Sequence, residues 1–472
     1  MKKIKFYIAL FVFAFTGFSS CEDVELDDFS NGQADFSTYV ALGNSLTAGF
    51  GDGTLYRSGQ ENSYPALLAE SMSFVGGSSD FNQPLTPNDV GGLTLAGNPL
   101  PGFDTRLMLQ EGAGGALGIV NTPTASSTEV TNSVAGSGPF QNLGVPGAKS
   151  FHLLGPDYGN IAGLAAMPAT ANPYYVRFTQ PGQSLLDAAM AQNPTFFTLW
   201  IGNNDVLTYA AAGGDADAIT PPAQFQNFFG ALLQGMTANG ADGVVGNVPD
   251  ILDLPYFTVV PTNPIPLDDA TANALNAGYA TYNAGLDQIV MVNPLLAPEV
   301  AQRKINFSAG QNFPVFIDDE LTDLTGFGLP SIRQAKPGEV ITLPASSLFA
   351  GGAGTQSPLS GTFVLSINEL DEISTAINSY NQIIDATAAS FGVTVADMNS
   401  YFSSISNTGI TYSGADYSTT FVTGGLFSLD GIHPTQKGYA VVANQFIDVI
   451  NSSYGANLPT IDINKYPGVD LP

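Results

Sequence analysis

Ser45 is a candidate nucleophile because of its position in the sequence. It follows the apolar run 39–42 and Gly43, and small residues that can open a helix come after it. A strand that ends at a glycine can turn sharply, so the Ser45 hydroxyl would lie at the carboxyl edge of a sheet. Backbone amides at the start of the next helix would stabilise negative charge developing there. For this stretch alone, a capping serine in an ordinary strand–turn–helix is the simpler explanation.

Two further apolar runs end in groups that can donate hydrogen bonds. In residues 140–148 a strand is expected to end at Gly144, where the turn can direct a backbone N–H at a neighbouring pocket. In residues 199–205 the run ends in a glycine, two asparagines and an aspartate. Asn204 can donate an amide N–H to a developing oxyanion, whereas Asp205 is expected to cap the following helix.

The chain has two histidines, and one of them has an aspartate three residues before it. Pro434 disfavours the helical region for His433 and suits the first turn of a final helix. Asp430 can then accept a hydrogen bond from Nδ1–H of the imidazole and leave Nε2 free to take a proton from serine. The competing histidine, His152, lies on a glycine-rich loop.

Five short apolar segments are predicted to be buried parallel strands that position these groups. They cover residues 39–42, 140–143, 196–201, 244–248 and 393–398.

Helices alternate with these strands. The clearest helix covers residues 367–391, with Ser366 and Glu369 as a capping box and Gly392 at its end. A final helix is expected at about 435–450. This alternation favours a doubly wound α/β sheet with the site at its carboxyl edge.

Two stretches exceed a minimal α/β unit. Residues 50–138 are expected to be mostly long loops, and residues 251–365 to hold a helix near 268–292 followed by mixed loop and strand. Both are interpreted as insertions in one domain, with a separate second domain as the alternative. The apolar residues at 254–257 and 326–330 are expected either to wall an acyl pocket or to pack as a satellite core.

Taken together, the four motifs resemble the SGNH/GDSL hydrolase family. They occur in the family's order and span nearly the whole mature chain. They are Gly43-Asn44-Ser45-Leu46, Gly144, Gly202-Asn203-Asn204-Asp205 and Asp430-Gly431-Ile432-His433-Pro434. The resemblance implies a flavodoxin-like three-layer α/β/α sandwich with a five-stranded parallel sheet and long loop insertions, and an ester hydrolase that needs no cofactor.

The resemblance also assigns roles to individual residues. Ser45 would be the nucleophile, His433 the base and Asp430 its orienting acid. The oxyanion hole would use the backbone N–H groups of Ser45 and Gly144 and the side chain of Asn204. Two features bear on this assignment. Position 44 is asparagine where the family more often has aspartate, and position 47 is threonine, which argues against the Gly-x-Ser-x-Gly elbow of α/β-hydrolases.

The N-terminus has the features of a secretory signal peptide. Residues 1–20 begin with lysines and continue into the apolar run 6–18. That run is too short to cross a bilayer of about 30 Å as a helix. Cys21, the only cysteine, follows small residues and resembles the lipidated cysteine of bacterial lipoproteins. A plain secreted protein with an incidental thiol is the alternative.

The expected organisation follows from these features. Residues 1–20 are a lipoprotein signal peptide, 21–35 an acidic tether, 36–455 the hydrolase domain and 456–472 a C-terminal tail. The protein is expected in the cell envelope as an outer-membrane lipoprotein, on the periplasmic or the exposed side, attached to the membrane through Cys21.

Charge and side-chain clusters exclude several other functions. With 13 basic and 41 acidic residues the net charge is −28, which would repel nucleic acid. No Cys/His cluster suggests zinc, and there is no phosphate-binding loop. Asp318, Asp319, Glu320 and Asp323 lack the spacing of a calcium loop and are expected to form a solvated acidic surface.

The sequence therefore predicts a serine esterase that hydrolyses lipid or acyl esters through an acyl-enzyme on Ser45, without a metal or cofactor. A carbohydrate O-acetylesterase is one alternative. A surface lipoprotein that binds glycans without catalysis is another.

Overall fold

The computed structural model describes residues 28–112, 115–214 and 218–472. The predicted signal peptide, Cys21 and the first part of the predicted tether lie outside the described residues.

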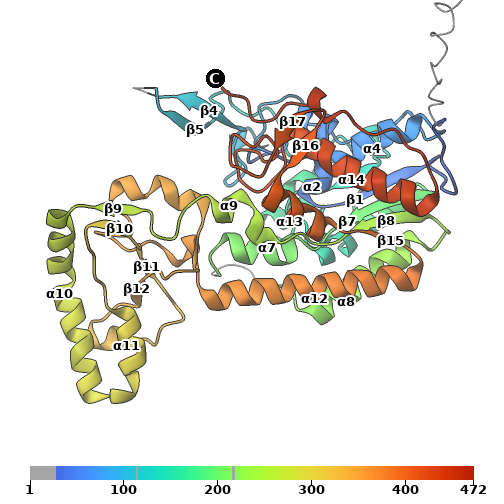
Figure 1. Ribbon diagram of the computed structural model, residues 1–472. Coiled ribbons are helices and arrows are strands. Elements are labelled where there is room, and N and C mark those ends of the chain that lie inside the picture. The colour runs from blue at the N-terminus through green and yellow to red at the C-terminus, as the bar shows by residue number, and fades with distance from the viewer. Residues whose placement is uncertain (1–27, 113–114, 215–217) are drawn as a thin grey trace, which may run out of the picture.

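A parallel sheet of five strands lies at the centre of the described chain (Figure 1). Its spatial order is β15-β8-β7-β1-β6, which in chain order is the 2-1-3-4-5 arrangement of flavodoxin-like folds. The sheet confirms the predicted fold class and all five predicted strands. These strands are β1 (Tyr39–Gly43), β6 (Asn142–Gly144), β7 (Phe196–Trp200), β8 (Asp242–Gly246) and β15 (Thr394–Ala396).

Alternate side chains of each strand point to opposite faces of the sheet. Val40 and Leu42 of β1 pack in the core cluster that holds the apolar faces of α8 (Pro222–Met236) and α12 (Ile367–Phe391). Tyr39 and Ala41 pack in a second cluster with α4 (Tyr64–Ser73) and α14 (Gln436–Tyr454). Helices therefore cover both faces, which gives the three layers of the fold.

Local capping explains why the clearest helix was predictable. In α12 the Ser366 side chain accepts from the Glu369 N–H and the Glu369 carboxylate accepts from the Ser366 N–H, as the capping box predicts. Gly392 ends the helix with a φ of 71°, in the left-handed region that glycine favours. The predicted final helix is confirmed as α14, and the predicted helix near 268–292 as α10 (Asp269–Val292).

The prediction that residues 50–138 are mostly loop is wrong for α4. This helix buries Tyr64, Leu67, Leu68 and Met72 in the core. The residues on either side of this helix are rich in Ser, Gly and Asn. Its apolar face is short, so the hydrophobic repeat in the sequence did not indicate a helix. The same stretch also forms α3 (Arg57–Glu61) and two strand pairs: β2 (Thr94–Leu95) with β3 (Asn98–Pro99), and β4 (Leu107–Glu111) with β5 (Leu117–Asn121).

A lobe projects from one side of the sheet body in Figure 1. It contains α10 and α11 (Ala297–Arg303), and its short strand pairs have separate small cores. These pairs are β9 (Ile265–Leu267) with β10 (Gly310–Asn312) and β11 (Val315–Ile317) with β12 (Ile332–Gln334). The lobe falls within the stretch predicted as the second insertion; whether it is a separate domain stays a prediction.

The remaining elements are short. The helices are α2 (Ser45–Ala48), α5 (Pro173–Val176), α6 (Leu185–Met190), α7 (Asn204–Ala211), α9 (Pro255–Thr258) and α13 (Met398–Thr408). The strand pairs are β13 (Val340–Ile341) with β14 (Val364–Leu365) and β16 (Ile410–Tyr412) with β17 (Ala415–Tyr417).

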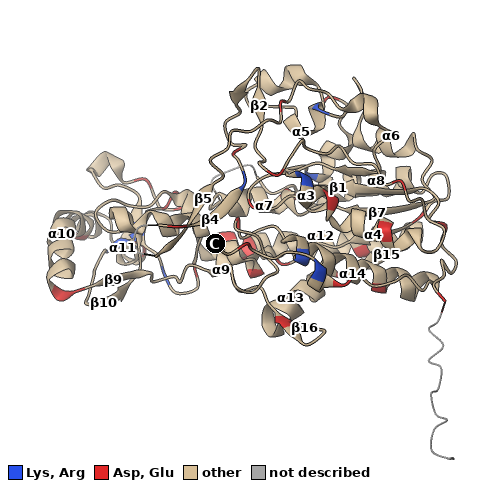
Figure 2. Cartoon of the chain, turned by 90° about the horizontal axis from the view of Figure 1, so that it is seen from above, with Lys and Arg blue, Asp and Glu red and all other residues tan. Residues whose placement is uncertain are grey.

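Acidic residues are spread over the sheet body and the lobe, and basic residues are sparse (Figure 2). Asp318 was expected on a solvated acidic surface, but it is buried and forms an ion pair with Arg333, which also pairs with Glu339. Asp319, Glu320 and Asp323 are exposed.

Within the described ranges, no group of three or more His, Cys, Asp or Glu side chains is arranged to hold a metal ion. Among the same residues, no helix combines the length and the apolar character needed to cross a membrane.

Candidate active site

Strand β1 delivers Ser45 to the carboxyl edge of the sheet, as predicted. Gly43 ends the strand where a Cβ atom would lie 2.5 Å from the Trp200 carbonyl oxygen, so a side chain has no room there. Ser45 is the first residue of α2, and the Asn44 side chain caps this helix by accepting from the Leu46 N–H at 3.0 Å. The asparagine at position 44 thus supplies the acceptor that this turn needs.

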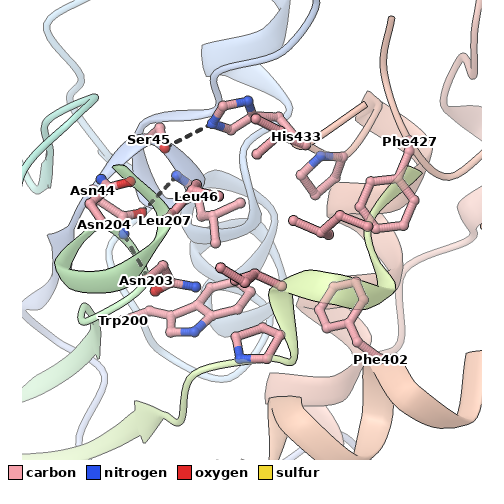
Figure 3. A pocket seen from close by; sticks show the side chains of 15 residues that line it. Asn44, Ser45, Leu46, Trp200, Asn203, Asn204, Leu207, Phe402, Phe427 and His433 are labelled. Carbon is pink, nitrogen blue, oxygen red and sulfur yellow. Dashed lines mark hydrogen bonds between the residues drawn. The ribbon is translucent and has the colours of Figure 1, made fainter. Parts of the chain in front are cut away.

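The structure brings Ser45, His433 and Asp430 together. His433 Nε2 lies 2.9 Å from Ser45 Oγ, and His433 Nδ1 lies 2.9 Å from Asp430 Oδ2. Figure 3 shows the serine and the imidazole facing each other at one end of a pocket. His152 lies elsewhere: its ring stacks on Tyr158, with 4.1 Å between the ring centroids.

Asp430 is held as a carboxylate. Its Oδ1 accepts from the backbone N–H groups of Ile432 and His433, at 2.9 Å each, and its Oδ2 faces the imidazole. Burial alone would raise the pKa of Asp430, but the imidazole and these N–H groups lower it to about 2. Asp430 can therefore hold the imidazole with its proton on Nδ1, which leaves Nε2 able to accept a proton from the serine hydroxyl.

Asn204 also lies at this site. It is the first residue of α7, and its Nδ2 donates to the Ala148 carbonyl at 3.0 Å, which leaves its second N–H for another acceptor. The prediction for Asp205 is wrong. Instead of capping α7, its carboxylate accepts from the backbone N–H and the hydroxyl of Ser150 at 2.8 and 2.7 Å, and it ties down the loop after β6.

The structure does not bring the Gly144 N–H to the predicted oxyanion position. This N–H donates to Asn142 Oδ1 at 3.0 Å, and a Cβ at Gly144 would lie 2.3 Å from the Ala48 nitrogen. The donor is therefore already engaged, and the residue is packed against the end of α2. Sequence reasoning missed Asn142. Its side-chain oxygen accepts from the Gly144 N–H, and its side-chain nitrogen donates to the Thr47 carbonyl at 2.9 Å.

The loop after β6 offers another donor. The Ala148 N–H donates to the Val145 carbonyl at 3.0 Å, and Gly147 has a φ of 80°. With Pro146 before it, this is the sequence pattern of a type II turn. The Gly147 N–H donates no hydrogen bond to any of the described residues. The Pro146-Gly147 pair in the sequence could have indicated this turn and its N–H donor.

The pocket beside Ser45 is mainly apolar, with about 480 Å³ of empty space including its open mouth. Trp200 and Phe402 lie across it from Ser45 in Figure 3. Its polar edge is formed by Asn44, Ser45, Asn203, Asn204 and His433. The apolar lining is Leu46, Trp200, Leu207, Pro249, Ile251, Leu254, Phe402, Phe427, Ile432 and Pro434.

The second predicted insertion contributes only its beginning to this pocket. Ile251 and Leu254 line it, and the Tyr256 N–H donates to the Gly431 carbonyl at 2.9 Å. The prediction that residues 326–330 wall the acyl pocket is wrong, because none of them lines it. There Leu329 is buried in a small core within the lobe and Phe327 is 68% exposed. The satellite core is the explanation that holds for Leu329.

A comparison with known protein families agrees with part of this arrangement. The family model of GDSL-like lipases/acylhydrolases matches residues 319–446, which include Asp430 and His433 and do not include Ser45. No curated protein matches the chain.

Two solved structures resemble the chain with low sequence identity and low TM-scores. The lipase/acylhydrolase from Enterococcus faecalis is 11% identical, over 90% of this chain and 98% of that one, with a TM-score of 0.31. LAE5, an alpha/beta hydrolase enzyme from the metagenome of Lake Arreo, Spain, is also 11% identical, over 89% of this chain and 96% of that one, with a TM-score of 0.34. At such scores neither supports an argument about this chain.

The matched family model covers the histidine and its acid, and the sheet places Ser45 against them. Residues 319–446 therefore match the GDSL-like lipase/acylhydrolase family, and the chain carries the four motifs in the order found in SGNH/GDSL hydrolases.

Proposed function

We propose that this protein is a serine esterase that hydrolyses esters of apolar acyl groups through an acyl-enzyme on Ser45. The observation that carries the proposal is the hydrogen-bonded series Ser45–His433–Asp430 at the mouth of an apolar pocket. A nucleophile, its base and an orienting acid within hydrogen-bond reach are what acyl transfer requires.

In the first half of the reaction, His433 Nε2 takes the proton of Ser45 as Oγ attacks the ester carbonyl carbon. The carbonyl oxygen becomes an oxyanion, and the free N–H of Asn204 and the backbone N–H groups of Ser45 and Gly147 are the proposed donors to it. When the intermediate collapses, the C–O bond to the alcohol breaks and His433 gives its proton to the leaving alcohol.

In the second half, His433 takes a proton from water, and the resulting hydroxide attacks the acyl carbon of the acyl-enzyme. Collapse of this second intermediate breaks the bond to Ser45 Oγ, which regains a proton from His433, and the carboxylic acid leaves. All proton transfers use one imidazole nitrogen, so no metal or cofactor enters these steps.

The lining of the pocket favours an apolar acyl group. A chain of methylenes entering it leaves water for contact with Trp200, Phe402 and Phe427. Burial contributes about 0.8 kcal/mol per methylene. A carbohydrate O-acetylesterase and a glycan-binding protein without activity remain the alternatives that the first experiment separates.

The experiment is a series of p-nitrophenyl esters from acetate to dodecanoate, with fluorophosphonate labelling of the same protein. The proposed function expects labelling at Ser45 and a kcat/KM that rises beyond acetate. A maximum at acetate would favour the O-acetylesterase, and neither turnover nor labelling would favour the glycan-binding protein.

Phe402→Ala should shift the preferred acyl length upward. Removing the ring lengthens the apolar end of the pocket, so the ratio of kcat/KM for dodecanoate to that for butyrate should rise roughly 10-fold. Tyr401→Ala is the matched control, because Tyr401 lies next to Phe402 on α13 and does not line the pocket. An unchanged length profile in Phe402→Ala would remove this ring from the acyl site.

We also propose that the mature protein is held in the cell envelope by lipid on Cys21, on the outer membrane. The support is the sequence alone: a basic and apolar leader, small residues and then the only cysteine.

Cys21→Ser should therefore move the protein from the membrane fraction to the soluble fraction and abolish labelling by radioactive palmitate. Ser45→Ala is the control, since it leaves the leader intact and should stay with the membrane. Palmitate labelling that survives in Cys21→Ser would contradict the lipoprotein assignment.

A further inference from the structure

The turn at residues 51–54 is sharply defined by its own sequence. Gly51 and Thr54 exchange two backbone hydrogen bonds of 3.1 Å, and the residues between them, Asp52 and Gly53, have φ angles of 51° and 76°. Positive φ at both central positions is the geometry of a type I′ turn, for which Asp-Gly is a preferred pair. This turn follows the helix that carries the nucleophile.

Three hydrogen bonds join this turn to the loop that carries Asp430. The Gly53 N–H donates to Asp430 Oδ2 at 2.9 Å, and the Asp52 N–H donates to Ser428 Oγ at 2.9 Å. In the other direction, the Leu429 N–H donates to Asp52 Oδ1 at 3.0 Å. The Ser428 hydroxyl then donates to Asp430 Oδ1 at 3.0 Å. Both oxygens of the Asp430 carboxylate therefore contact the turn, one directly and one through a hydroxyl.

Arg106 fixes the side chain of Asp52. Two of its guanidinium nitrogens lie 2.9 Å from Asp52 Oδ2, and its central carbon lies 4.3 Å from the centre of the Tyr56 ring. Asp52 is only 6% exposed. Burial raises the pKa of Asp52 and Arg106 opposes that rise. The guanidinium thus favours the ionised carboxylate and leaves Oδ1 directed at the Leu429 N–H.

We infer that Asp52 and Arg106 are positioning residues for the Asp430–His433 pair. The inference rests on the proposed function, because it assigns a role to the acid and the base of that mechanism. Neither Asp52 nor Arg106 lines the pocket beside Ser45. Their effect should consequently appear in the rate of the chemical step and not in substrate binding.

The position of the turn at residues 51–54 affects the hydrogen bonds of Asp430. Asp430 Oδ2 serves both the Gly53 N–H and His433 Nδ1. If the turn moves, this oxygen loses one of its two fixed partners, and the imidazole can rotate away from Ser45. A displacement of about 1 Å at such a site can lower the rate about 100-fold.

The experiment compares Asp52→Asn, Arg106→Met and Arg106→Lys on a short, soluble ester. Asp52→Asn and Arg106→Met should lower kcat about 10- to 100-fold with KM nearly unchanged. Arg106→Lys should recover part of kcat, because the ammonium still pairs with Asp52. Arg57→Met is the matched control, since Arg57 forms an exposed pair with Glu61 and should leave kcat unchanged.

A second measurement reads the position of the histidine without turnover. The low-field proton resonance of His433 Nδ1–H, hydrogen-bonded to Asp430, should shift or broaden in Asp52→Asn and in Arg106→Met and remain unchanged in Arg57→Met. The double variant Asp52→Asn/Arg106→Met should lose no more kcat than the worse single variant, because both changes release the same turn.

Variants that lose thermal stability but keep kcat and the low-field resonance would overturn the inference, since the turn would then act only in folding. If Arg106→Met does not fold, Asp52→Asn decides, because it preserves the shape of the side chain. A wild-type protein that turns over no ester overturns the proposed function instead, and the resonance still tests whether the turn positions His433.

Discussion

Ser45→Ala and His433→Ala should each lower kcat by about 10⁴- to 10⁶-fold. In the proposed mechanism Ser45 Oγ forms the covalent bond, and His433 Nε2, which lies 2.9 Å from it, moves every proton. Because the two groups act as one unit, the double variant should be hardly worse than either single one. Steady-state turnover of p-nitrophenyl butyrate by purified variants, with fluorophosphonate labelling, measures this effect.

His152→Ala is the control for the histidine. Its ring stacks on Tyr158, away from Ser45, so its removal should leave turnover within a small factor of wild type. Loss of activity in His152→Ala with retention in His433→Ala would assign the base to the other histidine. Activity that persists in Ser45→Ala would refute the acyl-enzyme.

Asp430→Asn should lower kcat about 10⁴-fold at neutral pH while changing KM little. The asparagine amide can donate to His433 Nδ1, which moves the imidazole proton to Nε2 and blocks that atom from accepting the serine proton. The control is Asp157→Asn, since Asp157 is an exposed aspartate. An Asp430→Asn variant with nearly full turnover would show that the imidazole needs no carboxylate here.

The same substitution should change how stability depends on pH. The pKa of Asp430 is lowered from 3.8 to about 2 in the folded protein. Its contribution is therefore fully present above pH 3.8 and is lost as the pH falls through about 2. It amounts to about 2 kcal/mol of unfolding free energy. Denaturant unfolding at pH 6 and pH 2.5 should show a smaller loss of stability in Asp430→Asn than in wild type.

Much of the site was readable from the sequence because its determinants are local. Each of the segments that carry Ser45, Asn204 and His433 ends an apolar run or opens a helix, and neighbouring residues decide that geometry. The capping box of α12 and the Asp-x-x-His spacing are further examples, since every partner lies within three residues. Hydrophobic period and capping chemistry therefore gave the five strands and the principal helices, and the resemblance to a known family then assigned roles to the three residues of the proposed triad.

The direction of Gly144 could not be read in this way. A glycine at a strand end can point its N–H to either side, and here the side chain of Asn142 decides the matter. That side chain is itself fixed by the Thr47 carbonyl, 95 residues earlier in the chain. The pocket lining has the same character, because Leu207, Leu254, Phe402 and Phe427 come from segments that meet only in the folded protein.

The sequence by itself thus determined the fold class and the candidate nucleophile and base, because local hydrogen bonds and the period of burial are set by near neighbours in the chain. Only the tertiary structure decided which N–H groups near Ser45 are already engaged, what lines the apolar pocket and what holds Asp430. The Gly53–Asp430 hydrogen bond spans 377 positions. Contacts of that range depend on how whole layers pack, and no spacing within a motif encodes them.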